Sequence, residues 1–340
     1  MIKQYDSQDQ RHEVSSYLYT YACHEDEREL CALELKRLLD TEPQPGYVET
    51  PIAISPERSP FVHYRLDIQW EAHSLEALEQ LAVQINVLNE REDADLPTFY
   101  SHGDEALRTF KLLCLDAQQT FSYEEKRQLE RRIGMCIHGK AQMKQPQLLF
   151  GMAYSGGRWV LGRCYLAESV WLQHNDKPRH YSTALSTRVA RAAVNIALPH
   201  PTGRTLIDPC CGIGTVLVEA LSMNIDIVGY DLNPLAVQGA RENLQHYGMP
   251  NIVSIGDLRQ LKGSYDALIL DLPYNLCSVL EEDERLHMLQ AAARLAHTQL
   301  VISTENIANS LAEAGLTVQH ICHLHKGKFT RYLWLCSYQF

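Results

Sequence analysis

Hydrophobic and polar positions along the chain follow two regular patterns, and together they predict a mixed α/β protein. Stretches such as residues 17–21 alternate with the two-residue period of a strand, whereas residues 29–39 place apolar side chains at helical spacing. The stretch 41–46, rich in proline, breaks this first block, and the charged residues 88–105 predict a loop. The strands predicted in the first half are 17–21, 62–68, 110–115, 148–153 and 159–163, with helices at 29–39, from Ser74 onwards and at 123–137. This order of elements predicts a compact α+β N-terminal half.

From residue 183 the pattern changes to the alternation of strands and helices that is typical of a doubly wound α/β domain. One helix has clear limits, because Asn233 can cap it, Pro234 suits its first turn and Gly248 can end it. The last two strands are so close in sequence that they predict an antiparallel hairpin. The predicted strands are 204–208, 225–231, 252–255, 265–271, 299–304, 317–325 and 330–338, and helices at 184–197 and 216–223 are among those between them.

Length and composition place the chain among ordinary globular proteins. Its 340 residues are enough for two or three domains, and 45% of them are hydrophobic. No apolar run approaches the length of a membrane span, and the polar start of the chain does not predict a signal peptide. The ten cysteines form no C-x-x-C pair, which favours reduced thiols, a cytoplasmic protein and no zinc ribbon.

The net charge of −11 is unevenly distributed along the chain. Residues 1–100 carry 8 Lys+Arg against 20 Asp+Glu, whereas residues 101–200 carry 14 against 8 and are therefore basic. Phosphate binding needs a local positive surface rather than a positive total charge. The middle third could supply such a surface, and solvated helix faces are the alternative interpretation.

A glycine turn directly after a predicted strand is the first candidate for binding a cofactor. The sequence Asp208-Pro-Cys-Cys-Gly-Ile-Gly-Thr contains two glycines that permit positive φ and let backbone N–H groups approach a ligand. It lacks the third glycine of a dinucleotide turn, which favours S-adenosylmethionine (SAM) over a nicotinamide cofactor. Asp231 ends the next strand, where a carboxylate can bind ribose hydroxyls, and Asp257 ends the third, where it can accept from the adenine amino group. The candidate cofactor residues in these segments are Asp208, Pro209, Cys211, Gly212, Gly214, Thr215, Asp231, Leu232, Asp257 and Leu258.

The segment Asp271-Leu-Pro-Tyr-Asn275 is the candidate for catalysis. The amine of a nucleobase is a poor nucleophile, because its lone pair is delocalised into the ring. If Asp271 and the carbonyl of Leu272 or Pro273 accept its two hydrogens, the lone pair can point at a methyl donor. Tyr274 would stack on the base. We therefore interpret the chain as a SAM-dependent N-methyltransferase acting on nucleic acid.

Three weaker signals lie outside these motifs. His320, His323 and His325 share a strand-like stretch, but no carboxylate or cysteine completes a ligand set at the usual spacing, so we expect no metal site. Lys326, Lys328 and Arg331 lie on or beside the hairpin turn and could contact phosphate. Cys210, Cys211 and Cys277 are interpreted as small buried residues rather than as nucleophiles.

The motifs resemble those of the THUMP-domain RNA methyltransferases, especially the enzymes that make N2-methylguanosine in tRNA. The segment 208–215 is similar to the family's D-P-x-C-G-x-G-T, and 271–274 is similar to its D-P-P-Y, with Leu272 in place of a proline. Residues 177–195 resemble the family's R-x-Y…L-A-R-A-x-V-N stretch. In the N-terminal half, residues 110–166 are similar to the latter part of a THUMP module.

The resemblance implies a fold, a domain order and further site residues. The fold is a Rossmann-like class I SAM methyltransferase domain, whose seven-stranded sheet is mostly parallel with an antiparallel last strand, after an α+β, ferredoxin-like or THUMP-like half. The domains are then 1–60 (a small N-terminal domain), 61–166 (THUMP-like, RNA-binding), 167–182 (a linker) and 183–340 (methyltransferase). Tyr181 and Ser182 lie near SAM, while Asp271, Pro273 and Tyr274 hold the target base. The candidate base- and RNA-binding residues are Leu272, Asn275, Arg131, Arg132, Lys326, Lys328 and Arg331.

Several alternatives stay open at this point. The leading hypothesis is a guanine-N2 methyltransferase of tRNA, with SAM as its cofactor and RNA as its partner. A methyltransferase for adenine N6 or another amine in rRNA or DNA is a second, and an inactive RNA-binding protein with this fold is a third. The sequence does not indicate whether an activating subunit is needed.

Overall fold

The structure is a computed structural model that describes residues 14–87, 108–181, 184–273, 281–326 and 329–338. It divides into two compact units. The N-terminal unit comprises Met1–Ala22, Pro43–Pro56 and Val62–Ala167, and the C-terminal unit comprises Cys23–Glu42, Glu57–Phe61 and Glu168–Phe340. Short 3-10 helices in the chain are η1 (Glu25–Glu27), η2 (Pro56–Arg58), η3 (Val170–Asp176) and η4 (Leu258–Gln260).

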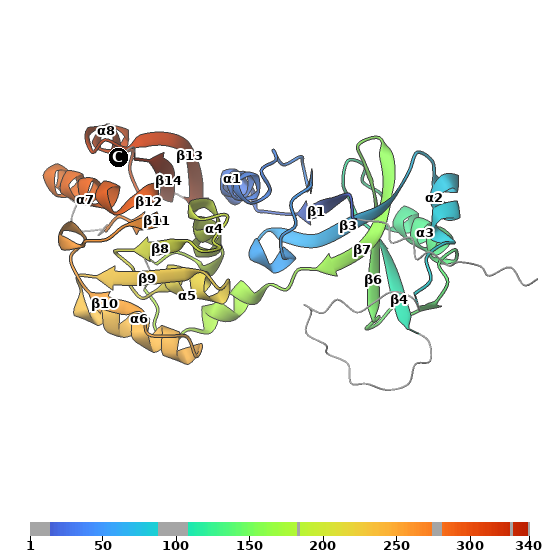
Figure 1. Cartoon of the computed structure of the whole chain (residues 1–340), viewed down its shortest axis with the longest axis horizontal. Coiled ribbons are helices and arrows are strands. Elements are labelled where there is room, and N and C mark those ends of the chain that lie inside the picture. The colour runs from blue at the N-terminus through green and yellow to red at the C-terminus, as the bar shows by residue number, and fades with distance from the viewer. Residues whose placement is uncertain (1–13, 88–107, 182–183, 274–280, 327–328, 339–340) are drawn as a thin grey trace, which may run out of the picture. The chain divides into compact units, whose positions relative to one another are not determined.

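The N-terminal unit is built on one mixed seven-stranded sheet with the order β2-β1-β3-β7-β6-β4-β5 (Figure 1). Its strands are β1 (Ser16–Tyr21), β2 (Tyr47–Thr50), β3 (Val62–Ala72), β4 (Thr109–Cys114), β5 (Lys140–Ala141), β6 (Leu148–Ser155) and β7 (Arg158–Leu166), and its helices are α2 (Leu75–Ala82) and α3 (Tyr123–Gly134). Both helices begin where the sequence places a cap: Ser74 accepts from the Ala77 amide, and Ser122 forms a capping box with Glu125. Leu78 and Ile133 bring the helices into one core with Phe110 and other side chains of the sheet.

The predicted boundary at residue 60 does not coincide with a structural boundary. β1 pairs with both β2 and β3, so residues on either side of position 60 belong to one sheet. The helix α1 (Arg28–Leu39) lies between β1 and β2 in sequence but packs in the C-terminal unit. Hydrophobic periodicity reports which face of a helix is buried, not which partner buries it, and this explains the difference.

The C-terminal unit has the predicted doubly wound fold. Its sheet has the order β10-β9-β8-β11-β12-β14-β13, and β14 is antiparallel to both neighbours. The strands are β8 (Thr205–Asp208), β9 (Asp226–Asp231), β10 (Val253–Ile255), β11 (Tyr265–Asp271), β12 (Ala296–Ser303), β13 (Thr317–Lys326) and β14 (Phe329–Ser337). The helices besides α1 are α4 (Thr187–Ala197), α5 (Thr215–Ser222), α6 (Pro234–His246), α7 (Glu282–Leu295) and α8 (Ala308–Glu313). The sequence thus predicted the class of this sheet and its antiparallel last hairpin.

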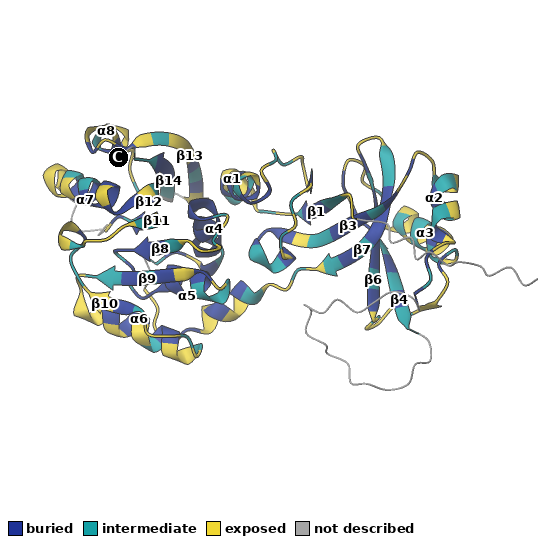
Figure 2. Ribbon diagram, viewed as in Figure 1, coloured by how far each residue is buried: buried dark blue, intermediate teal, exposed yellow. Residues whose placement is uncertain are grey.

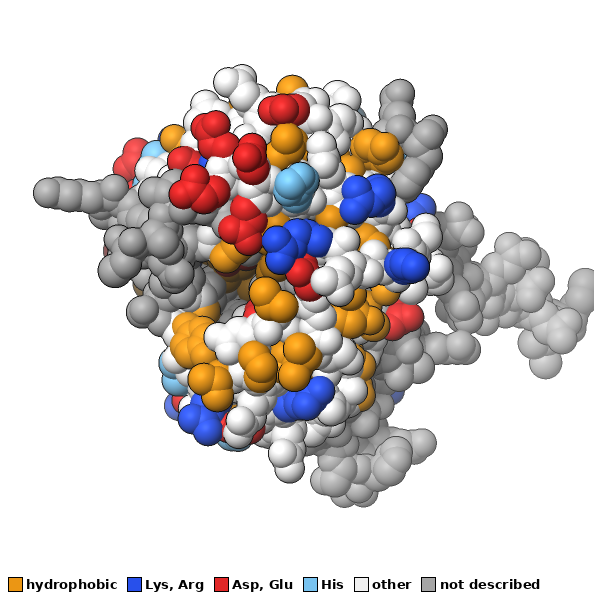
Figure 3. All heavy atoms as spheres, turned by 90° about the vertical axis from the view of Figure 1, so that its left-hand side faces the viewer, with side chains coloured by type: hydrophobic (Ala, Val, Ile, Leu, Met, Phe, Trp, Pro, Cys, Tyr) orange, Lys and Arg blue, Asp and Glu red, His pale blue; other side chains and the backbone are white. Residues whose placement is uncertain are grey.

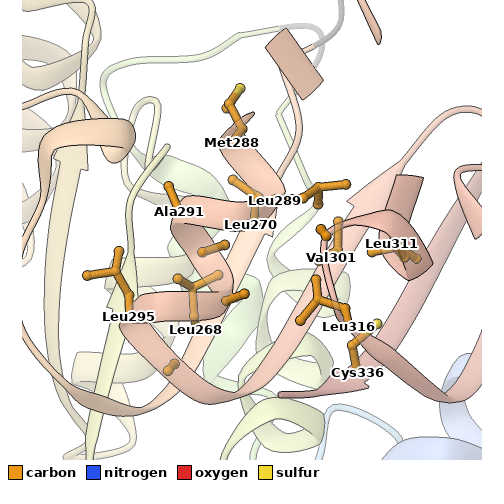
Figure 4. Close-up of a cluster of buried hydrophobic side chains, with 14 of the residues drawn as sticks. Leu268, Leu270, Met288, Leu289, Ala291, Leu295, Val301, Leu311, Leu316 and Cys336 are labelled. Carbon is orange, nitrogen blue, oxygen red and sulfur yellow. The ribbon is translucent and has the colours of Figure 1, made fainter. Parts of the chain in front are cut away.

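Helices cover both faces of this sheet. Leu268 and Leu270 of β11 point into a hydrophobic cluster with Met288, Leu289 and Leu295 of α7 (Figure 4). α4 contacts β11 and β12 and also packs against α1 and α5. The buried residues of the unit lie along its strands and on the inner sides of its helices (Figure 2). The strands at the centre of the sheet are therefore held rigidly, and their ends make a firm base for a site.

The order of strands reverses next to β8, because β9 lies on one side of it and β11 on the other. In open α/β sheets the crevice at such a reversal, beyond the carboxyl ends of the strands, is where ligands bind. The candidate motifs follow β8 and β11, so the fold places both at this crevice. No helix in the described parts of the chain is long and apolar enough to cross a membrane.

Candidate methyl-transfer site

The turn after β8 has the backbone shape that its glycines permit. Gly212 has φ 54° and Gly214 has φ 80°, a region that other residues rarely adopt. A Cβ atom on Gly214 would lie 3.2 Å from the Cβ of Ala240, so this glycine allows close packing against α6. A Cβ on Gly212 would meet no atom within 4 Å, which leaves the backbone there open to a ligand.

Asp231 fastens this turn to the end of β9. Its Oδ2 accepts a hydrogen bond from the Gly212 amide at 2.8 Å, and its Oδ1 accepts from the Asn233 amide at 2.8 Å. The Cys211 amide also donates to the carbonyl of Tyr230 at 2.8 Å. The two bonds to its oxygens fix the carboxylate, which lines the pocket and can still accept further hydrogen bonds. Such a preorganised acceptor suits the two hydroxyls of a ribose.

Asp257 has a partner that the sequence did not indicate. The guanidinium of Arg259 donates to both of its carboxylate oxygens, with 2.7 Å between Arg259 Nη2 and Asp257 Oδ2, and the Arg259 amide donates to Oδ1 at 2.9 Å. These bonds lower the pKa of Asp257. Arg259 also lies 3.6 Å from Glu284 of α7. Asp257 therefore holds the η4 turn, and its ion pair with Arg259 occupies the carboxylate that the sequence predicted as an acceptor for adenine.

Asp208 is buried at the end of β8, and burial raises its pKa well above the usual range. The nearby charges of Asp271 and Asp231 act in the same direction, while a hydrogen bond from the Cys210 amide opposes them. This direction of the pKa shift makes Asp208 easier to protonate than an exposed aspartate. We therefore assign Asp208 to the structure of the turn, where its Oδ1 accepts from the Cys210 amide.

Asp271 is the last residue of β11 and lies near Asp208. Its Oδ1 is buried and has no hydrogen-bond partner among the described residues. Burial raises the pKa of Asp271 to about 7, and the positive charge of Arg331 opposes this shift. A buried oxygen with no partner is costly, so such an atom often marks a binding or catalytic role.

Leu272 continues the ladder between β11 and β12 by one residue. Its amide donates to the carbonyl of Ile302 at 3.0 Å, a bond that the proline of the D-P-P-Y motif could not make. The Leu272 side chain is buried in the hydrophobic cluster under α7. The hydrogen bond and the packing thus fix the backbone that a proline would restrict through its ring.

A pocket of about 460 Å³ joins the two motifs. It is lined by most of the predicted cofactor and base residues: Tyr181, Asp208, Pro209, Cys211, Gly212, Thr215, Asp231, Leu232, Asp257, Leu258, Asp271, Leu272 and Pro273. Gly214 lies behind the turn, at the start of α5, rather than in the lining. Ser182, Tyr274 and Asn275 lie outside the described residues. Asn233, Arg259 and Met288 line the pocket as well, although the motifs did not point to them as ligands.

The predicted RNA-binding residues are not gathered at this pocket. Arg131 and Arg132 lie at the end of α3 in the N-terminal unit, where Arg132 forms ion pairs with Glu76 and Glu79. Arg331 lies within β14 and is half-buried, rather than on the hairpin turn. Lys328 and the side chain of Lys326 lie outside what the structure describes. His323 contacts Glu29 of α1, with 2.8 Å between Nδ1 and Oε2.

Two buried polar residues behind the pocket escaped the sequence motifs. Lys177 is buried and donates from Nζ to Thr215 Oγ1 at 3.2 Å, which places a cation at the first residue of α5. Burial lowers the pKa of this lysine, and the charge of Glu219 partly opposes the shift. Asn243 of α6 donates to the carbonyl of Ile213 at 2.9 Å and accepts from the Arg179 amide at 2.9 Å. Neither residue has a sequence signal beyond its place near a motif.

The pocket fits SAM in size and in the order of its chemical groups. Its volume lies in the range of about 300–1,000 Å³ that is usual for small-molecule sites. The open backbone at Gly212 can approach a ligand closely, Asp231 suits a ribose, and Leu232 and Leu258 offer apolar surfaces for a purine ring. Figure 3 shows the left-hand side of Figure 1, where acidic side chains gather along one border of a hollow and hydrophobic side chains along another.

Comparisons with known proteins agree with this geometry. Residues 175–309 match a family model described as the RMKL-like methyltransferase domain. The chain is 32% identical over 176 residues to the tRNA (guanine(10)-N2)-dimethyltransferase of Methanothermobacter thermautotrophicus, which covers 48% of this chain and 52% of that protein. It is 25% identical over 229 residues to the mouse U6 snRNA (guanine-N(2))-methyltransferase THUMPD2, which covers 62% of this chain and 42% of that protein. The chain thus spans about half the length of the curated relatives that it matches.

Among solved structures, the crystal structure of TrmN from Thermus thermophilus resembles the chain with a TM-score of 0.46 and 18% identity. That match covers 95% of this chain and 100% of TrmN.

Proposed function

We propose that this protein, in which residues 175–309 form an RMKL-like methyltransferase domain, transfers a methyl group from SAM to the N2 amine of a guanine in RNA, with tRNA as the substrate. The observation that carries the proposal is that Asp271, whose buried Oδ1 has no hydrogen-bond partner among the described residues, lines the same pocket as the glycine turn at Gly212. The relatives that methylate guanine N2 in tRNA and in U6 snRNA support the choice of base and of RNA.

The residues of the pocket divide into those that hold SAM and those that hold the amine. Asp231, Leu232, Leu258 and the backbone around Gly212 would hold the cofactor. When bound, SAM supplies a methyl group on a positively charged sulfur. Asp271 and the carbonyls that follow it would hold the target amine, because they belong to the same lining and follow β11, on the other side of β8 from Asp231.

Asp271 prepares the amine by accepting a hydrogen bond from one of its two N–H groups. A carboxylate acceptor in a water-poor site localises the nitrogen lone pair and so makes the amine a better nucleophile. When the nitrogen forms its bond to carbon, it must lose a proton, and Asp271 with a pKa of about 7 can hold that proton at neutral pH. The hydrogen bond from the Leu272 amide to the carbonyl of Ile302 keeps the acceptor carbonyls in place during the reaction.

We further propose that the N-terminal unit binds the RNA. The basic residues of the middle third support this, and exposed Arg131 lies on the surface of α3. Arg132 contributes less than the sequence predicted, because Glu76 and Glu79 already share its charge. If the N-terminal unit binds the RNA through its shape and its phosphates, the methyltransferase domain itself does not need a basic surface.

The test is transfer of tritiated methyl from SAM to unmodified tRNA transcripts, with rRNA and duplex DNA alongside. We expect label on tRNA, recovered as N2-methylguanosine after digestion. The Asp271→Ala variant should bind SAM in calorimetry but transfer no label. Label found only on adenine of rRNA or DNA would show that tRNA guanine is not the substrate. Absence of SAM binding to the wild-type protein would exclude the enzymatic role.

A further inference from the structure

Arg331 lies at the same end of the strands of the C-terminal sheet as Asp271. The register aligns Asp271 with Ile302 of β12, and Ile302 with Leu333 of β14. Arg331 is two residues before Leu333 in the chain, and β14 runs antiparallel to β12. It therefore extends beyond Leu333 toward the pocket end of the sheet.

Both side chains also project from the same face of the sheet. Laterally aligned residues in a sheet share a face, and residues two apart in a strand do so too. Asp271, Leu333 and Arg331 therefore share one face, opposite to the face of Leu270 and Trp334, which pack in the cluster under α7 and α8. Neighbouring strands are about 4.8 Å apart, so an arginine on β14 can reach across β12 to the end of β11.

The charge of Arg331 reaches Asp271. It acts on the carboxyl group of Asp271 and opposes the effect of burial there. Arg331 is half-buried, so its guanidinium acts where water screens it less than at the open surface. A carboxylate acceptor and a guanidinium donor thus lie on the same face and at the same end of the sheet, on two strands that are separated by β12.

This pair matches the edge of guanine and not that of adenine. Guanine presents an exocyclic amine, a ring N–H and an oxo group in a row, and the first two donate while the third accepts. Adenine presents no oxo group. An arginine beside an aspartate offers a donor and an acceptor in the order that guanine requires.

We propose that Arg331 is a specificity-determining residue of the acceptor-base site. Its guanidinium donates a hydrogen bond to the oxo group of the same guanine from whose amine Asp271 accepts one. The inference rests on the proposed function and deepens it. It assigns to Arg331 a base contact in place of the phosphate contact that its sequence position near the hairpin turn predicts. It also gives a physical reason for guanine rather than adenine as the substrate.

The experiment changes one atom of the base and one side chain of the enzyme. A tRNA transcript carries either guanosine or 6-thioguanosine at the mapped position of methylation. Sulfur is a weak acceptor, and the change keeps both the amine and the ring N–H. The enzymes are the wild type, Arg331→Met, Arg331→Lys and, as a matched loss of charge on the same unit, Arg294→Met at the exposed end of α7.

We expect the wild type to prefer guanosine in kcat/KM by about tenfold or more. Arg331→Met should lower kcat/KM on guanosine by about 10- to 100-fold, the usual cost of losing a charged hydrogen bond, but on 6-thioguanosine by less than about threefold. Arg331→Lys should keep part of the preference, and Arg294→Met all of it. SAM affinity in calorimetry and the circular dichroism spectrum should be unchanged in all variants.

Two results would overturn the inference. If the wild type methylates guanosine and Arg331→Met lowers both substrates equally, Arg331 does not contact the oxo group, and the proposed function stands. If the wild type methylates neither transcript, the proposed function fails and the inference fails with it.

Discussion

At the residue scale, the sequence motifs identified residues that line one pocket, but they did not indicate the state of each group. Asp208, Asp231, Asp257 and Asp271 all end strands at one crevice, as their order predicted. Their surroundings nevertheless differ: Asp231 is held by two amides, Asp257 by Arg259, and Asp208 by burial. These differences arise from contacts between elements that are distant in sequence.

Asp271 predicts a pH dependence of the transfer step. Burial raises its pKa to about 7, Arg331 opposes this, and the neighbouring Asp208 and Cys210 also have pKa values well above their usual range. The carboxylate form of Asp271 is gained as pH rises through about 7. We expect the single-turnover rate with saturating SAM to rise by about tenfold between pH 6 and pH 8. A flat profile over this interval would contradict the role of Asp271.

Leu272 predicts an effect of a single backbone hydrogen bond. Leu272→Pro restores the D-P-P-Y sequence but removes the donor to the buried carbonyl of Ile302. We expect the free energy of unfolding to fall by roughly 1–3 kcal/mol, the cost of a buried carbonyl without its partner. Urea denaturation measures this, and Leu272→Val, which keeps the amide, is the control. Equal stability of wild type and Leu272→Pro would show that the bond contributes nothing.

At the scale of elements, hydrophobic periodicity found most helices and strands of both units. The helix predicted at 184–197 begins at Thr187, because the Ser186 hydroxyl caps it by accepting from the Val189 amide. The helix predicted at 123–137 ends at Gly134. The short strands β2 and β5, of four and two residues, were not predicted.

A buried polar network fastens α4 to α5 and η3. Arg191 donates from Nη1 to Glu219 Oε2 at 2.9 Å, and His174 Nδ1 lies 2.7 Å from Glu219 Oε1. Arg191 also donates to the carbonyls of Glu57 and Arg58. The pattern of the sequence could not reveal this, because each residue alone looks like an ordinary surface charge.

The network predicts a large effect of removing its cation. Arg191→Ala would leave Glu219, whose side chain is fully buried, without its main counter-charge. We expect a loss of roughly 3–5 kcal/mol in the free energy of unfolding. Arg294→Ala, at an exposed position, should change it by less than about 0.5 kcal/mol. A loss below 1 kcal/mol for Arg191→Ala would mean that the network is not a stabilising element.

At the scale of the whole molecule, the sequence showed a change of pattern near residue 183, but it did not show the path of the chain between the two units. The helix α1 belongs to the C-terminal unit, where Arg37 Nε donates to the carbonyl of Ile196 at 3.0 Å. Asn195 Nδ2 donates to the buried Glu34 at 2.6 Å. Ser59, which also donates to Glu34 at 2.7 Å, comes from the second segment that returns to this unit.

This chain path predicts that the C-terminal unit does not fold from the C-terminal segment alone. A fragment of residues 168–340 lacks α1 and residues 57–61, so it exposes the face of α4 that they bury. We expect the fragment to be less stable than the full chain and to aggregate, and we expect addition of a peptide of residues 23–61 to restore part of its stability. Thermal melting measures both. A fragment that melts at the same temperature as the full chain would contradict this organisation.

The central claim is methylation of guanine N2 in RNA at the Asp271 site. Its most direct test is mass spectrometry of nucleosides from an unmodified tRNA transcript after incubation with SAM and either the wild type or Asp271→Ala. We predict N2-methylguanosine with the wild type and none with the variant, although both bind SAM. The same methylated nucleoside with Asp271→Ala, or a methylated adenosine with the wild type, would contradict the account.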